Sequence, residues 1–354
     1  MNRTKHLDSQ FILGHSKGRF LIQLDELGHL PDGILETGVE DVQRVFSNPT
    51  LVHLPGEYAP IFVSILLHGN EDAGWLALQE FVRRRGRQTL RRGLVLFVGN
   101  VESCAPARRF LTHQVDFNRA WPGSDLPRSP VHDLLETVTD KVLRSGIVAS
   151  IDVHNNTGRN PHYGCICSEE ASHIRLASMF SRRVVYFTKP HGVQTQAFMH
   201  HCPSVTCECG KIGDHAGAVR AADLIDACVA DDFKEEALVR DVEVYSMIAR
   251  IKVREHCTVG FDTGADIVLR KDLDLLNFQN LDAGEEIGTL SSRIDDCFVV
   301  NDTAGHDVTS DYLTLSNQHI RFGKSVMPSM LTQDLDVIKK DCLGYIMERK
   351  NLDS

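Results

Sequence analysis

Long apolar runs, an excess of basic charge and a disulfide-type cysteine spacing are all missing from this 354-residue sequence. The longest apolar stretch, residues 59–67, is far shorter than the roughly 20 residues that a membrane-spanning helix needs. The first ten residues lack the apolar run of a secretory signal, so we expect a cytoplasmic protein with no membrane partner. No internal repeat or low-complexity segment is present, which argues against solenoid and fibrous folds.

The charge balance is acidic, with 38 basic and 48 acidic residues and a formal net charge of -10 at pH 7. An acidic chain repels a phosphate backbone, so nucleic acid is not an expected partner. One basic run, Arg83–Arg92, opposes this trend. We interpret it as the solvated end of a surface helix followed by a loop, with phosphate or protein binding as the alternative.

The ten cysteines are interpreted as reduced thiols, because their spacing fits no small disulfide scaffold. Two pairs, Cys165-x-Cys167 and Cys207-x-Cys209, suggest a four-thiolate zinc site as an alternative. Zinc-binding cysteines are usually spaced by two to four residues in loops, whereas Cys207 and Cys209 share one face of an apolar, strand-like stretch. We therefore favour buried free thiols that point away from the intervening Glu208.

Short apolar runs alternate with helical patterns through residue 234, and this alternation predicts an α/β domain over residues 1–234. Several of the runs are continuously apolar, as expected of strands buried on both faces of a mostly parallel sheet. The predicted strands are residues 20–24, 51–54, 61–67, 94–98, 147–153, 184–187 and 205–209. The predicted helices are residues 75–82, 131–143 and 216–230.

Residues 235–354 have a different sequence pattern and are predicted to form a smaller, acidic, β-rich domain. The segment Ile248–Val253 alternates apolar and charged residues, which is typical of a half-exposed strand. Further short strands are predicted at residues 265–269, 286–290 and 297–300, separated by turns rich in Asp and Gly. The predicted fold class is therefore α/β, with a mixed, mostly parallel sheet flanked by helices and a β-rich C-terminal domain.

Chemically versatile side chains follow or occupy three of the predicted strands. His68 and Glu71 come directly after the run 61–67, His154 follows 147–153, and Glu208 lies within 205–209. In open α/β sheets, functional groups collect beyond the carboxyl ends of the strands. We therefore expect these side chains to meet at one edge of the sheet.

Two histidines and one carboxylate are a common set of catalytic zinc ligands, with the fourth position left for water. The predicted site is one zinc ion per chain bound by His68, Glu71 and His154, with Asp152 as the partner of the His154 imidazole. Zinc lowers the pKa of its water to about 7. Burying an unpaired carboxylate costs free energy, so we expect a buried Glu208 to have a function. We predict that it is the general base and acid. Each residue alone also fits a structural role, so the prediction depends on the whole set.

A polar loop between the first two predicted helices supplies further candidates. Arg108 and Arg109 precede Phe110, and the run Asp116–Gly123 includes Asn118 and Arg119. Arginine binds a carboxylate through two parallel hydrogen bonds, and asparagine can add another. This pattern suits a substrate with a free carboxylate, and the alternative is an ordinary loop in which Asn118 caps a helix.

Taken in order, four motifs resemble the zinc carboxypeptidase-like enzymes, and most closely their succinylglutamate desuccinylase and aspartoacylase branch. The motifs are His68-Gly-Asn-Glu71, Asp116-Phe-Asn-Arg119, Asp152-Val-His154-Asn and Glu208-Cys-Gly210, and the likeness spans about residues 60–215. The resemblance implies a β-rich tail domain, zinc ligands at His68, Glu71 and His154, and a general base and acid at Glu208. It also implies that Asn118 and Arg119 bind a substrate carboxylate and that Arg109, or its neighbour Arg108, polarises the scissile carbonyl.

We therefore expect a zinc-dependent hydrolase that cleaves the amide bond of an N-acyl amino acid or a similar small, carboxylate-bearing substrate. One alternative is a metallo-carboxypeptidase that acts on peptides. A second is a non-catalytic module that binds metal and a protein partner, although an unligated Glu208 would then have no use. The acyl group, the amino acid and any self-association into a homo-oligomer stay open, and Arg159 is interpreted as a surface residue rather than as a contact for a second carboxylate.

Overall fold

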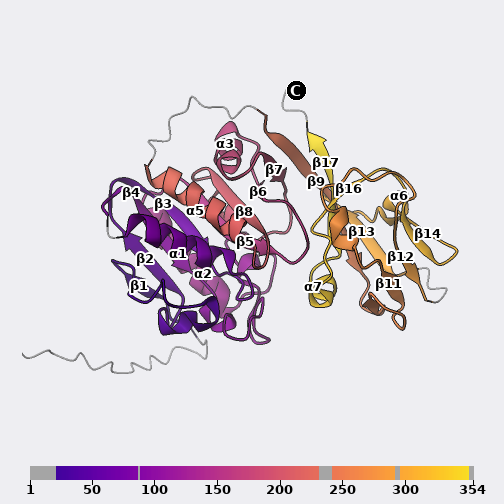
Figure 1. Ribbon diagram of the computed structural model, residues 1–354, viewed down its shortest axis with the longest axis horizontal. Helices are drawn as coiled ribbons and strands as arrows, with labels where there is room; N and C mark the ends of the chain where they lie inside the picture. Colours follow the sequence, from indigo (N-terminus) through magenta and orange to yellow (C-terminus); the bar gives the residue numbers. More distant parts are fainter. Residues whose placement is uncertain (1–20, 87, 231–240, 292–295, 351–354) are drawn as a thin grey trace, which may run out of the picture.

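The computed structural model describes residues 21–86, 88–230, 241–291 and 296–350 (Figure 1). Its strands are β1 (Asp25–Leu27), β2 (Thr50–Leu54), β3 (Gly56–Ile65), β4 (Leu90–Val98), β5 (Ser150–Asn156), β6 (Tyr163–Ile166), β7 (Arg183–Tyr186), β8 (Ser204–Lys211), β9 (Glu243–Val253), β10 (Val259–Gly260), β11 (Ile267–Leu269), β12 (Glu286–Leu290), β13 (Phe298–Asp302), β14 (Leu313–Ser316), β15 (His319–Phe322), β16 (Met327–Ser329) and β17 (Gly344–Lys350). Its α-helices are α1 (Ala73–Arg85), α2 (Pro130–Arg144), α3 (Ala171–Phe180), α4 (Gln194–Phe198), α5 (His215–Ala230), α6 (Thr309–Tyr312) and α7 (Leu335–Lys340). Short 3₁₀ helices are η1 (Val39–Arg44), η2 (Val101–Ser103), η3 (Phe117–Arg119) and η4 (Leu273–Leu276).

The described strands form two sheets. The larger sheet has the order β1-β2-β4-β3-β5-β8-β6-β7-β9-β17-β16, with β13 also paired to β9. Its centre is parallel, because β3 pairs in parallel with β4 and β5, and β5 pairs in parallel with β8. Antiparallel pairs, such as β2 with β4 and β6 with β8, make the sheet mixed. The smaller sheet has the order β10-β11-β12-β15-β14, so the predicted α/β fold with a β-rich C-terminal region is confirmed.

Helices cover both faces of the larger sheet, and this explains the continuous apolar runs. Along β3, Ile61, Val63 and Ile65 pack into one core with α1, α3 and α5, whereas Phe62 packs into a second core with α2 and α4. Figure 1 shows α1 and α5 lying across this sheet. A strand that is buried on both faces has no solvent side and therefore no polar alternation.

Helix α2 shows how local sequence sets the helix boundaries. Pro130 occupies the first turn, where its missing N–H costs no hydrogen bond. The Ser129 backbone N–H donates to His132 Nδ1 over 3.2 Å, and the two side chains complete a capping box. Apolar side chains at helical spacing face the sheet, and those buried are Val131, Leu134, Leu135, Val138 and Val142.

Some predicted elements are wrong or displaced. The predicted strand 20–24 is absent from its described residues, 21–24, and β1 instead begins at Asp25 because that segment pairs with β2. The strand predicted at 147–153 begins at Ser150. The basic run does end helix α1, but its last residues, Leu90–Arg92, begin β4 rather than lie in a loop. Arg84 and Arg85 form ion pairs with Asp226 of α5, so part of the run is structural.

The C-terminal part of the chain both extends the larger sheet and builds a core of its own. Strand β9 pairs in parallel with β7, and β17 then pairs antiparallel with β9. The C-terminal strands, β9 and β17 included, enclose a separate apolar core that contains Ile287, Phe298 and Phe322. The predicted domain boundary between residues 234 and 235 lies outside the described residues and stays a prediction. No helix in the described ranges is both long and apolar enough to cross a bilayer.

The C-terminal part of the chain contacts the first part closely near Gly158. The Met330 N–H donates to Asn160 Oδ1 over 2.9 Å, and Asn277 Nδ2 donates to the Arg159 carbonyl oxygen over 3.4 Å. A Cβ atom added at Gly158 would lie 1.9 Å from the Leu331 carbonyl oxygen, which is backbone and cannot rotate away. The close approach of the two segments therefore requires glycine at this position.

We expect Gly158→Ala to lower the free energy of unfolding by about 1–3 kcal/mol, the usual cost of forcing extra volume into a packed region. Gly28→Ala is the matched control, because no atom lies within 4 Å of the added Cβ. Urea unfolding of both variants measures the difference. Equal stability of the two variants would show that the contact at Gly158 is not tight.

Candidate functional site

Side-chain alternation on β5 brings two of the predicted residues to one face of the larger sheet. Ile151 and Val153 pack into the core beneath α1 and α5, so Asp152 and His154 point to the opposite face. Ser64, on the neighbouring β3, donates its hydroxyl hydrogen bond to Asp152 Oδ1 over 2.7 Å. The Asp152 carboxylate is thereby fixed beneath the His154 ring.

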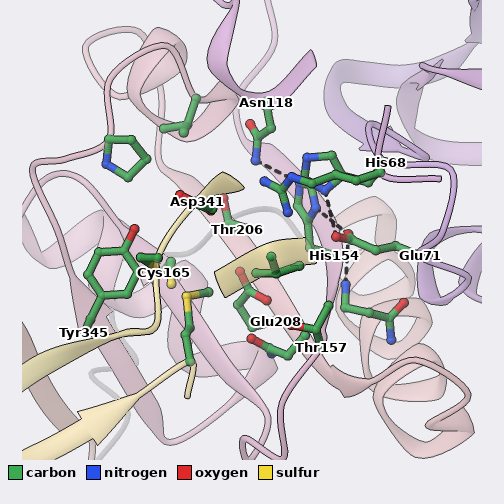
Figure 2. A pocket seen from close by; sticks show the side chains of 18 of the residues that line it. His68, Glu71, Asn118, His154, Thr157, Cys165, Thr206, Glu208, Asp341 and Tyr345 are labelled. Atoms are coloured by element: carbon green, nitrogen blue, oxygen red, sulfur yellow. Dashed lines mark hydrogen bonds and ion pairs between the residues drawn. The ribbon is translucent and has the colours of Figure 1, made fainter. Parts of the chain in front are cut away.

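Strand β8 shows the same alternation. Cys207 and Cys209 pack into the core on the face of α1 and α5, while Glu208 lines the pocket on the other face. In the parallel pairing of β5 and β8, Glu208 lies opposite His154 (Figure 2). The predicted orientation of the two cysteines, away from Glu208, is confirmed.

Two histidines and a glutamate converge at the carboxyl ends of β3 and β5. Glu71 Oε1 lies 2.7 Å from His68 Nδ1, and Glu71 Oε2 lies 2.7 Å from His154 Nδ1 (Figure 2). One potential ligand atom from each side chain lies within 4.8 Å of the others, and all three side chains are buried. The Asn155 N–H donates to Glu71 Oε2 over 3.1 Å and helps to fix the carboxylate. We call these three residues the His-Glu-His cluster.

The outer nitrogen of each imidazole faces a further carboxylate. His68 Nε2 lies 2.9 Å from Asp116 Oδ1, and His154 Nε2 lies 2.8 Å from Asp152 Oδ2. An acid behind a histidine fixes its tautomer and ring orientation, as is typical of histidines that bind metal. The Nδ1 atoms of both rings are thereby directed at the shared space beside Glu71.

The electrostatics of the cluster fit a bound cation. Burial disfavours a charged His154 imidazole, but the Asp152 and Glu71 carboxylates outweigh this effect and hold its pKa well above the ordinary value. Burial likewise opposes charge on Glu71, and the two imidazoles still hold its pKa below the ordinary value. A positive charge is therefore favoured between these groups, and a metal ion with two nitrogen ligands and one carboxylate ligand meets that demand.

Glu208 has no such partner. It is 7% exposed, and its Oε2 atom makes no hydrogen bond. Burial raises the pKa of Glu208 to about 8, with the nearby Glu71 and Asp152 carboxylates adding to the effect and His154 opposing it. A carboxyl group with a pKa near neutrality can both accept and donate a proton at physiological pH.

Asp116 connects the cluster to the arginines of the polar loop. Its Oδ1 atom accepts from the Asn118 backbone N–H over 2.8 Å, and its Oδ2 atom accepts from Arg109 Nε over 2.9 Å. Arg109 lines the same pocket as the His-Glu-His cluster. Arg108 instead is exposed and faces Asp336 at 3.9 Å, so of the two arginines only Arg109 is placed to meet a substrate.

Asn118 and Arg119 also line the pocket, but Arg119 is partly engaged by the chain itself. Asn118 Nδ2 lies 3.1 Å from His154 Nε2, and Asn118 Oδ1 accepts from the Gln194 N–H over 3.3 Å. Arg119 Nη2 donates to Asp341 Oδ2 over 3.3 Å. Arg250 donates to the other carboxylate oxygen of Asp341. Arg119, which was predicted to bind a substrate carboxylate, therefore already faces the Asp341 carboxylate of the C-terminal part.

Several residues of the pocket were missed by sequence reasoning. Asp116 lies in a recognised motif, so its place beside Arg109 was open to prediction from the sequence. Met247, Met330, Asp341 and Tyr345 also line the pocket, and all come from the C-terminal part. Their positions depend on the pairing of β9 with β7 and β17, for which the sequence contains no local signal.

Other sequence candidates lie apart from the cluster. Arg159 is exposed and faces the buried Asp274 at 3.7 Å, in agreement with its interpretation as a surface residue. His162 is also outside the cluster, and its Nε2 atom lies 2.9 Å from Asp214 Oδ2. Within the described ranges, the His-Glu-His cluster is the only group of three or more His, Cys, Asp or Glu side chains that converge at ligand distance. The four-thiolate alternative is therefore not supported.

Comparison with known proteins agrees with this geometry. Residues 61–226 match the family described as the succinylglutamate desuccinylase/aspartoacylase catalytic domain. The matched segment includes all four motifs, so the resemblance inferred from them is confirmed. A search of curated protein sequences finds no match.

Solved structures of two proteins named as desuccinylases and of an aminoacylase share the fold over most of the chain. Succinylglutamate desuccinylase from Chromobacterium violaceum has a TM-score of 0.55 at 15% identity, with 86% of this chain and 89% of that chain covered. Succinylglutamate desuccinylase/aspartoacylase from Rhodobacter sphaeroides has a TM-score of 0.56 at 13% identity, covering 83% and 87%. Murine aminoacylase 3 has a TM-score of 0.51 at 14% identity, covering 84% and 97%. At these identities the likeness establishes the fold alone.

The raised pKa of Glu208 predicts a pH-dependent stability of the metal-free protein. Because folding raises this pKa from 4.5 to about 8, the folded state binds the proton more tightly, and the stabilisation is lost as the pH rises from 4.5 through 8. Glu208→Gln removes this titration. We therefore expect the variant to gain stability relative to the wild type as the pH is raised from about 5 to about 9.

Urea unfolding in the presence of a chelator, across that pH range, measures the difference. Glu57→Gln is the control, because Glu57 is exposed on β3. A stability difference between wild type and Glu208→Gln that stays constant with pH would contradict the assignment of a buried, protonated Glu208.

Proposed function

We propose that the chain is a zinc-dependent deacylase that hydrolyses the amide bond of an N-acyl amino acid or a similar small amide with a free carboxylate. The observation that carries the proposal is the convergence of His68, Glu71 and His154 beside a buried, unligated Glu208. The match of residues 61–226 to the succinylglutamate desuccinylase/aspartoacylase catalytic domain supports deacylation rather than peptide hydrolysis. A purely metal-binding module would have no use for Glu208 in this position.

His68, Glu71 and His154 would hold one zinc ion per chain. When bound, zinc would lower the pKa of a coordinated water and polarise the carbonyl group of the amide. Asp116 and Asp152 would hold the two imidazoles in the tautomer with Nδ1 free for the ion. The Asn155 backbone N–H would keep the Glu71 carboxylate in place.

Glu208 would move the proton. As the general base it takes a proton from the attacking water while the new C–O bond forms at the amide carbon. As the general acid it returns that proton to the amide nitrogen while the C–N bond breaks. Its freedom from hydrogen bonds at Oε2 leaves it able to serve both steps.

Arg109 and Arg119 would orient the substrate. Arg109 donates its Nε–H to Asp116. Its two terminal amino groups would therefore be able to donate to the amide carbonyl oxygen, which becomes negative during attack. Arg119 uses Nη1 on the Asn118 carbonyl and Nη2 on Asp341, and its remaining N–H donors are available for the substrate carboxylate. Asn118 lines the same pocket and would add a further contact.

Metal analysis tests the first half of the proposal. We expect the purified protein, loaded with zinc and then dialysed, to retain about one zinc ion per chain, as three well-oriented ligands predict. His154→Ala removes one of the three ligands and should retain far less zinc. His113→Ala is the control because His113 is exposed, and the proposal fails if both variants retain equal amounts.

Turnover tests the second half. Glu208→Gln should keep the zinc ion but reduce kcat for amide hydrolysis by a factor of about 10²–10⁴, the usual contribution of general acid–base catalysis. Release of the free amino acid from a panel of N-acyl amino acids, dipeptides and tripeptides gives the rates, with Glu57→Gln as the control. Undiminished hydrolysis by the zinc-loaded Glu208→Gln variant would exclude the proposed role of Glu208. Faster cleavage of the peptides would favour the carboxypeptidase alternative.

A further inference from the structure

The pocket beside the His-Glu-His cluster has two chemically different sides. One side carries Arg109, Arg119 and Asp341. The other, which we call the apolar wall, is formed by Cys165, Phe187, Val193, Met247 and Met330. In Figure 2, Cys165 lies across the pocket from His68 and Glu71. The pocket therefore offers both charged and apolar contacts to a bound substrate.

The side chains at the charged side carry an excess of positive charge. Three guanidinium groups, Arg109, Arg119 and Arg250, face two carboxylates, Asp116 and Asp341. Burial disfavours charge on Asp341, yet the surrounding arginines hold its pKa below the ordinary value, so it remains an anion. One positive charge is thus left over, and a single substrate carboxylate balances it.

None of the five side chains of the apolar wall is a cation that could pair with a second carboxylate. Cys165, Phe187 and Val193 are buried and belong to one hydrophobic cluster, against which the partly buried Met247 and Met330 pack. Among the described residues that line the pocket, the only Lys or Arg side chains are Arg109 and Arg119, and neither belongs to the wall. A carboxylate placed against such a surface loses its hydration without gaining a partner.

An apolar group gains from the same surface. Covering the wall removes both its own apolar area and that of the ligand from water. The two methionines are unbranched and flexible, so they can adapt to side chains of different shape. The wall therefore favours apolar groups of the substrate in general, rather than a group of one particular shape.

We propose that the substrates are monocarboxylates: N-acyl amino acids whose side chain and acyl group are both uncharged, with the apolar part lying on the wall and the one carboxylate at the arginines. This inference rests on the proposed deacylase function and narrows it to a substrate class. A second carboxylate on either the side chain or the acyl group lowers kcat/KM.

Matched substrate pairs test the inference with the zinc-loaded, full-length protein. N-acetyl-L-methionine and N-acetyl-L-aspartate differ only in the amino-acid side chain, and N-acetyl-L-methionine and N-succinyl-L-methionine differ only in the acyl group. We expect kcat/KM for N-acetyl-L-methionine to exceed that for each dicarboxylate by about tenfold or more. Equal or faster hydrolysis of either dicarboxylate overturns the inference while leaving the deacylase function intact. Absence of hydrolysis of all three by zinc-loaded protein counts against the proposed function itself.

A charge introduced into the wall gives an independent test. Met247 is only partly buried, so a lysine at this position can keep its ammonium group hydrated in the pocket. Met247→Lys should raise the ratio of kcat/KM for N-acetyl-L-aspartate to that for N-acetyl-L-methionine by about tenfold, because the new cation pairs with the second carboxylate. Leu275→Lys, which adds the same charge at an exposed residue outside the pocket, should retain the wild-type ratio.

Zinc content and the thermal unfolding midpoint show whether both variants are folded. If Met247→Lys is folded and binds zinc but leaves the ratio unchanged, the wall does not contact the variable part of the substrate and the inference fails. If the lysine variant does not fold, the substrate pairs measured on the wild type still decide the question.

Discussion

The Glu71 carboxylate, held between two imidazoles that are otherwise far apart in the chain, is the interaction on which the site depends. Together with the outer acids it forms a row in which carboxylates and imidazoles alternate, from Asp116 through His68, Glu71 and His154 to Asp152. Such a row buries more acid than a protein tolerates without a compensating cation. Burial of the apolar cores on the two faces of the sheet offsets the free-energy cost of burying these acids. The same cores fix β3, β5 and β8 side by side.

Both parts of the chain line the pocket, and they contribute different residues. The first 226 residues supply the His-Glu-His cluster, Glu208 and the paired Asn118 and Arg119, whereas the C-terminal part supplies Asp341 and two methionines of the apolar wall. The groups of the proposed reaction therefore all come from the first part, whereas the apolar wall is built from both parts.

The sequence predicts much of the first part and little of the second. The run 61–67 is a central strand because both of its faces are apolar, and Glu208 is recognisable because it interrupts an apolar strand. Asp341 and Met247 have no such signal: each becomes part of the pocket only because β9 and β17 pair across about a hundred residues of chain. Helix α3 was also missed, since its ten residues give a weak periodic pattern between longer elements.

The central claim is that the His-Glu-His cluster is a metal site rather than a buried hydrogen-bond network. The most direct measurement is an anomalous-difference map, recorded at the zinc absorption edge from a crystal of the full-length protein grown with zinc. The account predicts one strong peak at coordinating distance, about 2.0–2.2 Å, from His68 Nδ1, His154 Nδ1 and a Glu71 oxygen. A map in which zinc lies elsewhere, while Glu71 still bridges the two imidazoles, would contradict it.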